Sequence, residues 1–302
     1  MPAPTLREGK QINEVADVIS GFERLGYITD RALATTIFLG MRLGKPVLLE
    51  GQAGLGKTEV AKVLAQFLEA PLIRLQCYEG LDINSAVYEW NYQRQLLAIK
   101  IEEGTDETVE QKEKHIFSRE FLMERPLLQA IQAQDLSPVL LVDEVDRADE
   151  AFEAFLLELL SDFQISIPEL GTIQARHVPY VVLTSNRSRE LSDALKRRCL
   201  YHWIEYPSLE KELKIVAARL PGIDAELNRQ LVKFVQSVRE FNLSKAPGIA
   251  ETLDWAEALI SLGKQRLDTE VVEATLGCLS KSVEDAARIR SAGIEKLIPQ
   301  AG

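Results

Sequence analysis

A complete phosphate-loop motif lies early in the chain, where residues 51–58 read G-x-x-x-x-G-K-T. It follows a short apolar run, Pro46–Glu50, and precedes a helical pattern over residues 57–69. In this context glycines let backbone N–H groups curl around phosphate oxygens, the lysine pairs with the β- and γ-phosphates, and the threonine hydroxyl binds Mg²⁺. A glycine-rich turn with an incidental lysine is the alternative, but the motif favours a nucleotide site. The residues expected to bind nucleotide are Gly51, Gln52, Ala53, Gly54, Leu55, Gly56, Lys57, Thr58 and Glu59.

An acidic pair follows a second apolar run, because Asp143 and Glu144 come directly after Val139–Val142. Ligands of open α/β sheets bind at the carboxyl ends of the strands, so a strand exit is a suitable place for catalytic carboxylates. There Asp143 can hold Mg²⁺ through a water, and Glu144 can polarise a second water for attack on the γ-phosphate. Alone, an Asp-Glu pair at a strand end is more often a solvated turn. Together with the phosphate loop, the pair predicts an ATPase, with ATP and Mg²⁺ as cofactors.

These two motifs need a sheet to position them, and the first two-thirds of the chain predict one. Short apolar runs between turn residues are typical of strands that are buried on both faces of a parallel sheet. Helical patterns separate most of the runs, so we expect an α/β fold with a mostly parallel five-stranded sheet between helices. The predicted strands are residues 46–50, 71–75, 138–142, 180–184 and 201–205. The predicted helices are residues 11–25, 30–43, 57–69, 125–134, 149–161 and 190–197.

A long segment between the second and third predicted strands interrupts this alternation. Residues 79–124 exceed the length of an ordinary connection, so we expect them to form an insert. Three aromatic side chains within residues 88–92 either anchor this insert on the core or contact a partner. The polar residues 102–114 are expected to be a solvent-exposed elaboration.

The pattern changes again further along the chain. Residues 163–175 alternate apolar and polar side chains around Gly171, which predicts a β-hairpin before the fourth strand. After Pro207 only helical periodicity remains. We therefore place a nucleotide-binding domain at residues 1–206 and a small all-helical lid domain at residues 207–302.

Composition excludes several classes of protein. The chain of 302 residues is 46% hydrophobic and 27% charged, as is usual for a soluble globular protein. No apolar run approaches the roughly 18 residues of a membrane span, and the N-terminal residues do not resemble a secretory signal. The net charge of −11 disfavours binding to a nucleic-acid backbone. Three widely spaced cysteines fit a reducing compartment, so we expect a cytoplasmic protein.

Further motifs resemble those of the AAA+ ATPases, and within that group those of the MoxR family. The likeness includes the runs Asp143–Ala148, Leu183–Asn186 and Asp193–Cys199, as well as the predicted hairpin. It covers essentially the whole chain and implies a P-loop AAA+ core followed by a helical lid. Two more runs, Leu200–Trp203 and Gly248–Trp255, resemble the branch linked to maturation of carbon monoxide dehydrogenase.

The resemblance also implies roles for single residues. Asn186 would be the sensor-1 residue that positions the attacking water. Arg198 would be the arginine finger that reaches the neighbouring subunit's site, with Arg197 as the alternative. Without the resemblance, a solvated basic helix end would be the simpler interpretation of these arginines. Tyr27 and Ile28 would cover the adenine, although a simple core contact is the other interpretation.

One departure from the family pattern concerns the lid. Relatives often carry a sensor-2 arginine at the start of the third lid helix, facing the γ-phosphate. The corresponding residues 246–253 contain no arginine. We therefore assign no sensor-2 residue and expect the lid to respond to nucleotide through other contacts.

The implied function is that of an ATP-driven remodelling chaperone that matures or activates a partner metalloenzyme or protein complex. Its implied partners are copies of itself in a ring, for which a hexamer is expected, a von Willebrand factor A-domain protein and a client enzyme. Two other classes stay open. One is a nucleic-acid motor or helicase loader on the same fold, which the acidic charge disfavours. The other is a slow ATP-dependent regulatory switch.

Overall fold

The computed structural model describes residues 4, 11–101 and 108–299, which divide into two compact units. The first unit comprises residues up to Val18, then Arg31–Glu50 and Ala61–His202. The second comprises Ile19–Asp30, Gly51–Val60 and the residues from Trp203 onward. The phosphate loop therefore groups with the helical C-terminal region. The division into domains at residues 206 and 207 stays a prediction.

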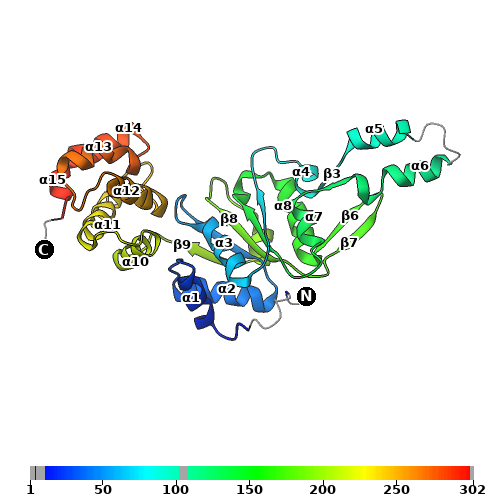
Figure 1. Cartoon of the computed structure of the whole chain (residues 1–302), viewed down its shortest axis with the longest axis horizontal. Coiled ribbons are helices and arrows are strands. Elements are labelled where there is room, and N and C mark those ends of the chain that lie inside the picture. The colour runs from blue at the N-terminus through cyan, green and yellow to red at the C-terminus, as the bar shows by residue number, and fades with distance from the viewer. Residues whose placement is uncertain (1–3, 5–10, 102–107, 300–302) are drawn as a thin grey trace. The chain divides into compact units, whose positions relative to one another are not determined.

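A five-stranded sheet in the order β2-β5-β8-β1-β9 carries the α/β part of the chain (Figure 1). Its strands are β1 (Val47–Gly51), β2 (Leu72–Gln76), β5 (Val139–Asp143), β8 (Tyr180–Ser185) and β9 (Leu200–Ile204). The pairs β1–β8, β2–β5 and β5–β8 are parallel. The carboxyl ends of these strands therefore meet at one edge, which confirms the predicted sheet.

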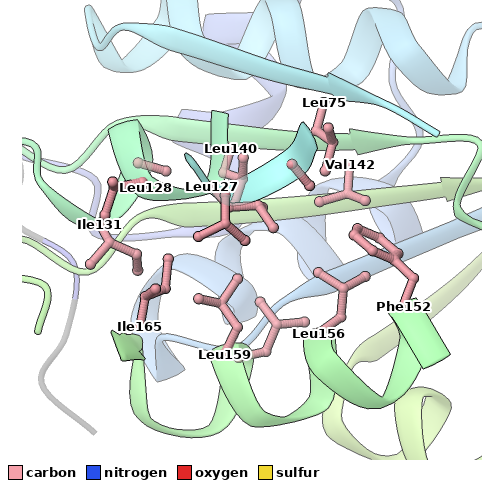
Figure 2. Close-up of a cluster of buried hydrophobic side chains, with 14 of the residues drawn as sticks. Leu75, Leu127, Leu128, Ile131, Leu140, Val142, Phe152, Leu156, Leu159 and Ile165 are labelled. Carbon is pink, nitrogen blue, oxygen red and sulfur yellow. The ribbon is translucent and has the colours of Figure 1, made fainter. Parts of the chain in front are cut away.

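Helices α7 (Pro126–Ile131), α8 (Glu150–Asp162) and α9 (Asp193–Arg198) contribute to the buried apolar core of the sheet. The same part of the sequence also forms α1 (Val15–Arg24), α2 (Arg31–Leu43) and α3 (Lys57–Leu68). Figure 2 shows how α7 and α8 direct leucines and a phenylalanine toward β2 and β5. On α8 the buried residues Phe152, Leu156 and Leu159 recur at helical spacing, so one stripe of the helix faces the strands. Asp149 starts α8 by accepting a hydrogen bond from the Phe152 N–H at 2.8 Å.

The insert at residues 79–124 contains a small sheet of its own. After α4 (Ile83–Val87), strand β3 (Tyr88–Trp90) pairs antiparallel with β4 (Leu122–Glu124). Between these strands lie α5 (Tyr92–Ile101), α6 (Val109–Ile116) and the 3-10 turn η1 (Arg119–Phe121). Residues 102–107 of the predicted polar elaboration lie outside the described residues, and the rest of it enters α6.

The aromatic stretch of the insert divides between core and surface. Trp90 is only 7% exposed, and its ring meets that of Phe117 edge-on with centroids 5.3 Å apart. Tyr92 is 64% exposed. Trp90 therefore anchors the insert, and the alternative that it contacts a partner is wrong for this residue.

The predicted hairpin is present as β6 (Gln164–Ile167) and β7 (Gly171–Gln174), paired antiparallel. Ile165 faces Ile173 across the pair, and both side chains are buried. Gly171 has φ +78°, a left-handed conformation that glycine adopts without strain. The alternation seen in the sequence thus buries one face of the hairpin.

The described residues after β9 form helices only. These are α10 (Leu209–Arg219), α11 (Ala225–Arg239), α12 (Ile249–Ser261), α13 (Thr269–Leu279), α14 (Val283–Ala292) and α15 (Ile294–Leu297). Trp255 is fully buried at their centre, where it contacts the Phe234 ring and donates a 2.7 Å hydrogen bond to Thr275 Oγ1. Within the described ranges, no helix has the length and apolar character to cross a membrane.

We predict that Trp90→Ala lowers the free energy of unfolding of the α/β unit by about 3–5 kcal/mol, the usual cost of truncating a buried tryptophan. The matched change Tyr92→Ala, two residues away but exposed, should stay within about 0.5 kcal/mol of the parent. Urea denaturation of both variants measures the difference. Equal stabilities would contradict the anchoring role of Trp90.

Candidate functional site

The acidic pair lies at the end of β5, in a turn that is hydrogen-bonded to the neighbouring strand β8. Glu144 has φ 54° and ψ 49°, a left-handed conformation that is uncommon for a residue with a side chain. Its N–H donates to Thr184 Oγ1 at 2.9 Å, and the same hydroxyl donates to Asp143 Oδ1 at 2.5 Å. One hydroxyl on β8 therefore fixes both the buried carboxylate and the strained turn beside it.

Two amide side chains orient the Glu144 carboxylate. Asn186 Nδ2 donates to Glu144 Oε1 at 3.2 Å, and Gln76 Nε2 donates to Oε2 at 3.2 Å. The side chain of Glu144 is 32% exposed, so water can reach it. Arg147 Nε also lies 3.4 Å from Glu144 Oε2. A carboxylate that is held by these three groups and is open to water is suited to polarise a water molecule. The structure thus brings together Glu144 and Asn186, two residues to which the resemblance gives neighbouring roles, and those roles stay predictions.

The loop that carries Asn186 is itself fixed by a buried carboxylate. Asp146, 2% exposed, accepts hydrogen bonds from the Asn186 N–H at 3.2 Å and the Ser188 N–H at 2.7 Å. Its Oδ2 also accepts from Ser188 Oγ at 2.6 Å. Asp146 therefore sets the position of the residue proposed to hold the attacking water.

Asp143 is buried and ion-paired. Arg74, on β2, approaches Asp143 Oδ2 with Nη2 at 2.6 Å and Nε at 3.1 Å. We had not predicted Arg74, Gln76 or Thr184. Gln76 and Thr184 are polar residues near the carboxyl ends of the strands that flank β5, whereas Arg74 lies in the middle of β2.

The one cysteine beside this cluster is not suited to nucleophilic chemistry. Cys77 directly follows β2, is fully buried, and its N–H donates to the Asp143 carbonyl at 2.8 Å. Burial, with the nearby charges of Asp143, Asp146 and Glu144, raises the pKa of the Cys77 thiol to about 12. The thiol therefore stays protonated at neutral pH, whereas the thiolate is the reactive form.

The phosphate loop belongs to the second unit, and its backbone has the curl that the motif requires. Gly54 and Gly56 have φ of +78° and +83°, which glycine alone adopts easily. The buried Lys57 donates from Nζ to the carbonyls of Gly51 at 2.8 Å and Gln52 at 2.6 Å. Since the carbonyl and N–H of a peptide point in opposite directions, such a curl presents N–H groups to an anion. The loop thus fits a bound phosphate chain.

The predicted adenine-covering residues also lie in the second unit. Gly26 and Tyr27 close the turn after α1, where the Tyr27 N–H donates to the Phe22 carbonyl at 2.9 Å. Burial, then the charges of Asp30 and Glu59, raise the pKa of the Tyr27 hydroxyl. Tyr27 and Ile28 are half-buried. The structure thus places Tyr27 near Glu59, the last residue of the predicted nucleotide set.

The two candidate finger arginines end α9 in the first unit, and both are exposed. Arg198 Nε donates to Ser161 Oγ on α8 at 2.9 Å, which gives its side chain a defined direction. Arg197 precedes it on the same helix end. The choice of Arg198 over Arg197 stays a prediction.

Residues 46–199, just over half of the chain, match the family model described as the AAA domain of the dynein-related subfamily. The match begins just before β1 and ends after α9, so it includes the phosphate loop, the acidic pair and Asn186.

Several proteins resemble the chain more distantly. The gas vesicle ATPase GvpN of Haloferax mediterranei is 23% identical over 217 residues, which cover 66% of this chain and 57% of GvpN. An uncharacterized protein of Staphylococcus epidermidis is 24% identical over 255 residues, 81% of this chain and 86% of that protein. The Holliday junction branch migration motor RuvB of Thermotoga maritima aligns with a TM-score of 0.46 and 19% identity over 82% of this chain and 66% of RuvB. The chain thus spans less than two thirds of the length of GvpN and of RuvB.

We predict that Thr184→Val destabilises the first unit by about 2 kcal/mol or more, because a buried polar group left without its partner costs about 1–3 kcal/mol. Valine keeps the shape but removes the hydroxyl that serves Asp143 and Glu144. Thr184→Ser keeps the hydroxyl and should lose only about 1 kcal/mol for one methyl. Urea denaturation compares the two variants. A valine variant at least as stable as the serine variant would show that the hydroxyl does not hold the turn.

Proposed function

The chain belongs to the AAA family, in its dynein-related subfamily, and we propose that it is an ATP-hydrolysing remodelling chaperone of the MoxR type. The observation that carries the hydrolytic part is the Glu144 carboxylate, held by Asn186 and Gln76 at a strand exit. A structural turn would not need a carboxylate that is oriented by two amides and open to water. The family match and the phosphate loop support ATP as the molecule it acts on.

Each residue of the proposed site has a distinct task. Lys57 and the loop N–H groups would bind the phosphates. Thr58 would hold Mg²⁺ directly and Asp143 would hold it through a water, and the ion would neutralise charge on the transferred phosphoryl group. Glu144 would accept a proton from the attacking water, and Asn186 would hold that water in place. Tyr27 and Ile28 would cover the adenine.

We extend the proposal to the assembly and the client. A ring, with six subunits expected, would let Arg198 stabilise charge in the neighbouring subunit's site. The client would be a metalloenzyme or protein complex, with a von Willebrand factor A-domain protein as a second partner. Support comes from the resemblance of Leu200–Trp203 and Gly248–Trp255 to the carbon monoxide dehydrogenase branch. The similarity to a gas vesicle ATPase supports the ATPase part of the proposal. Trp255 is buried and does not itself offer a contact to a client.

We predict that Lys57→Ala weakens ATP binding at least about tenfold, since a hydrogen bond to a charged group contributes about 1.5–3 kcal/mol. Lys62→Ala, which removes an exposed lysine from the same helix, should bind ATP like the parent. Calorimetric titration with Mg·ATP measures both affinities, and thermal melting shows whether the variants fold. Unchanged affinity in a folded Lys57→Ala protein would remove the phosphate loop from the proposal.

The same variant tests the class of partner. Parent protein in a slowly hydrolysed ATP analogue should retain a metalloenzyme or a von Willebrand factor A-domain protein that Lys57→Ala protein does not retain. That partner should in turn stimulate hydrolysis. Stimulation by DNA, with binding that weakens steeply as salt rises, would instead identify a nucleic-acid motor.

We predict that Arg198→Ala protein mixed with Lys57→Ala protein regains ATPase activity that neither has alone. In equal mixtures about a quarter of the interfaces of a cyclic ring join an intact loop to an intact finger. Arg197→Ala is the control and should not need a complementing partner. Absence of recovery in rings shown to have mixed would contradict a finger that acts between subunits.

A further inference from the structure

The first turn of α12 lies directly on the phosphate loop, within the second unit. The Ala250 N–H donates to the Gly54 carbonyl at 3.0 Å. A Cβ atom on Gly248 would lie 2.8 Å from the Gly54 carbonyl carbon and 3.0 Å from the Ala53 carbonyl oxygen. Gly248 has φ −83°, which any residue can adopt, so space and not backbone conformation requires glycine here. The two backbones are therefore in contact.

Glu251 closes this contact from the helix side. Its Oε2 accepts a hydrogen bond from the Gly248 N–H at 2.8 Å, which caps the start of α12. The same oxygen would lie 2.8 Å from a Cβ atom on Gly54. The carboxylate thus holds the Gly248 turn and also packs against the phosphate loop at its left-handed glycine.

A buried ion pair stabilises the turn at Pro247 and Gly248. Arg239 and Glu212 are 8% and 0% exposed, and the two guanidinium Nη atoms lie 2.6 and 2.7 Å from the Glu212 oxygens. Arg239 Nε donates to the Pro247 carbonyl at 2.8 Å. Thr252 Oγ1 lies 2.8 Å from Glu212 Oε1 and 2.9 Å from the Gly248 carbonyl oxygen. The pair therefore holds both peptides that flank the loop contact.

A second carboxylate secures the chain just before this turn. Asp285, 1% exposed, accepts hydrogen bonds from the N–H groups of Ser244 at 2.9 Å and Lys245 at 3.0 Å. These bonds, with that from the Ser244 hydroxyl, lower the pKa of Asp285. Residues 244–252 are thus fixed to α10, α11 and α14, and a movement of those helices would reach the phosphate loop.

We propose that Glu251 and the Arg239–Glu212 pair are positioning residues that set the shape of the phosphate loop. They would couple the helical region to nucleotide without an arginine on the γ-phosphate. The inference rests on the proposed function for its link to ATP, but the contact itself is a property of the protein alone. A change in the position of Gly54 when phosphates bind to the loop would shift the start of α12, because the two backbones are in contact.

The test combines four variants with two measurements. Glu251→Ala removes the cap, Glu251→Gln keeps an acceptor for the Gly248 N–H, and Gly248→Ala adds one methyl at the contact. Glu257→Ala is the matched control, since Glu257 is exposed on the same helix. Hydrogen exchange of the phosphate-loop amides is measured without nucleotide, and Mg·ATP affinity is measured by calorimetry.

We expect loop amides to exchange about tenfold faster and ATP to bind about tenfold more weakly in Glu251→Ala and Gly248→Ala, the scale expected for loss of a helix cap. Glu251→Gln and Glu257→Ala should resemble the parent. If Gly248→Ala does not fold, the loop exchange and the ATP affinity of Glu251→Ala test the inference alone.

A lower melting temperature with unchanged loop exchange and unchanged ATP affinity would reduce Glu251 to a structural cap and overturn the inference. Tighter ATP binding in both Glu251 variants would also overturn it, because that result would mean that the carboxylate acts only by repelling phosphate. A parent protein that binds no ATP would instead refute the proposed function, and hydrogen exchange alone would then decide the inference.

Discussion

The hydroxyl of Thr184 joins the two members of the acidic pair, and the geometry of the cluster depends on it. It reaches from β8 to the end of β5, where it binds the Asp143 carboxylate and the N–H of Glu144. Without it, the left-handed backbone at Glu144 would have no partner for its N–H at a point where strain is already stored. The strand order β2-β5-β8 then supplies Gln76 from one side and Asn186 from the other. The parallel sheet thus fixes the position and direction of the Glu144 carboxylate.

A different physical constraint governs the second unit, where glycines permit two backbones to meet. The phosphate loop and the start of α12 approach so closely that a methyl group on Gly248 would overlap the loop. Buried charges are costly unless paired, and here Arg239 and Glu212 satisfy each other while also holding the Pro247 peptide. Residues 246–253 contain no arginine that could serve as sensor 2. Instead, the backbone at Gly248 contacts the loop that would bind the phosphates.

Much of this could be read from sequence because it depends on local patterns. Apolar runs located each strand of the sheet, and the alternation around Gly171 located the hairpin. The placement of Asn186 beside Glu144 was implied only by the family resemblance, because an asparagine at a strand end is by itself more often a turn residue or a cap. The contacts of Arg74 with Asp143 and of Gly248 with Gly54 could not be predicted. They depend on strand order and on the approach of distant segments, which no local pattern encodes. Trp90 shows the same limit, since an aromatic run alone does not tell core from surface.

The central claim is that the oriented Glu144 carboxylate activates water for attack on ATP. The most direct test is a single-turnover measurement of phosphate release from Glu144→Gln protein loaded with Mg·ATP, beside a measurement of how much ATP it retains. The amide keeps the shape of the side chain but is a far weaker base, so ATP should stay bound while phosphate release falls by a factor of about 10²–10⁴. Phosphate release within a few-fold of the parent would contradict the account, because the carboxylate would then have no part in the chemistry.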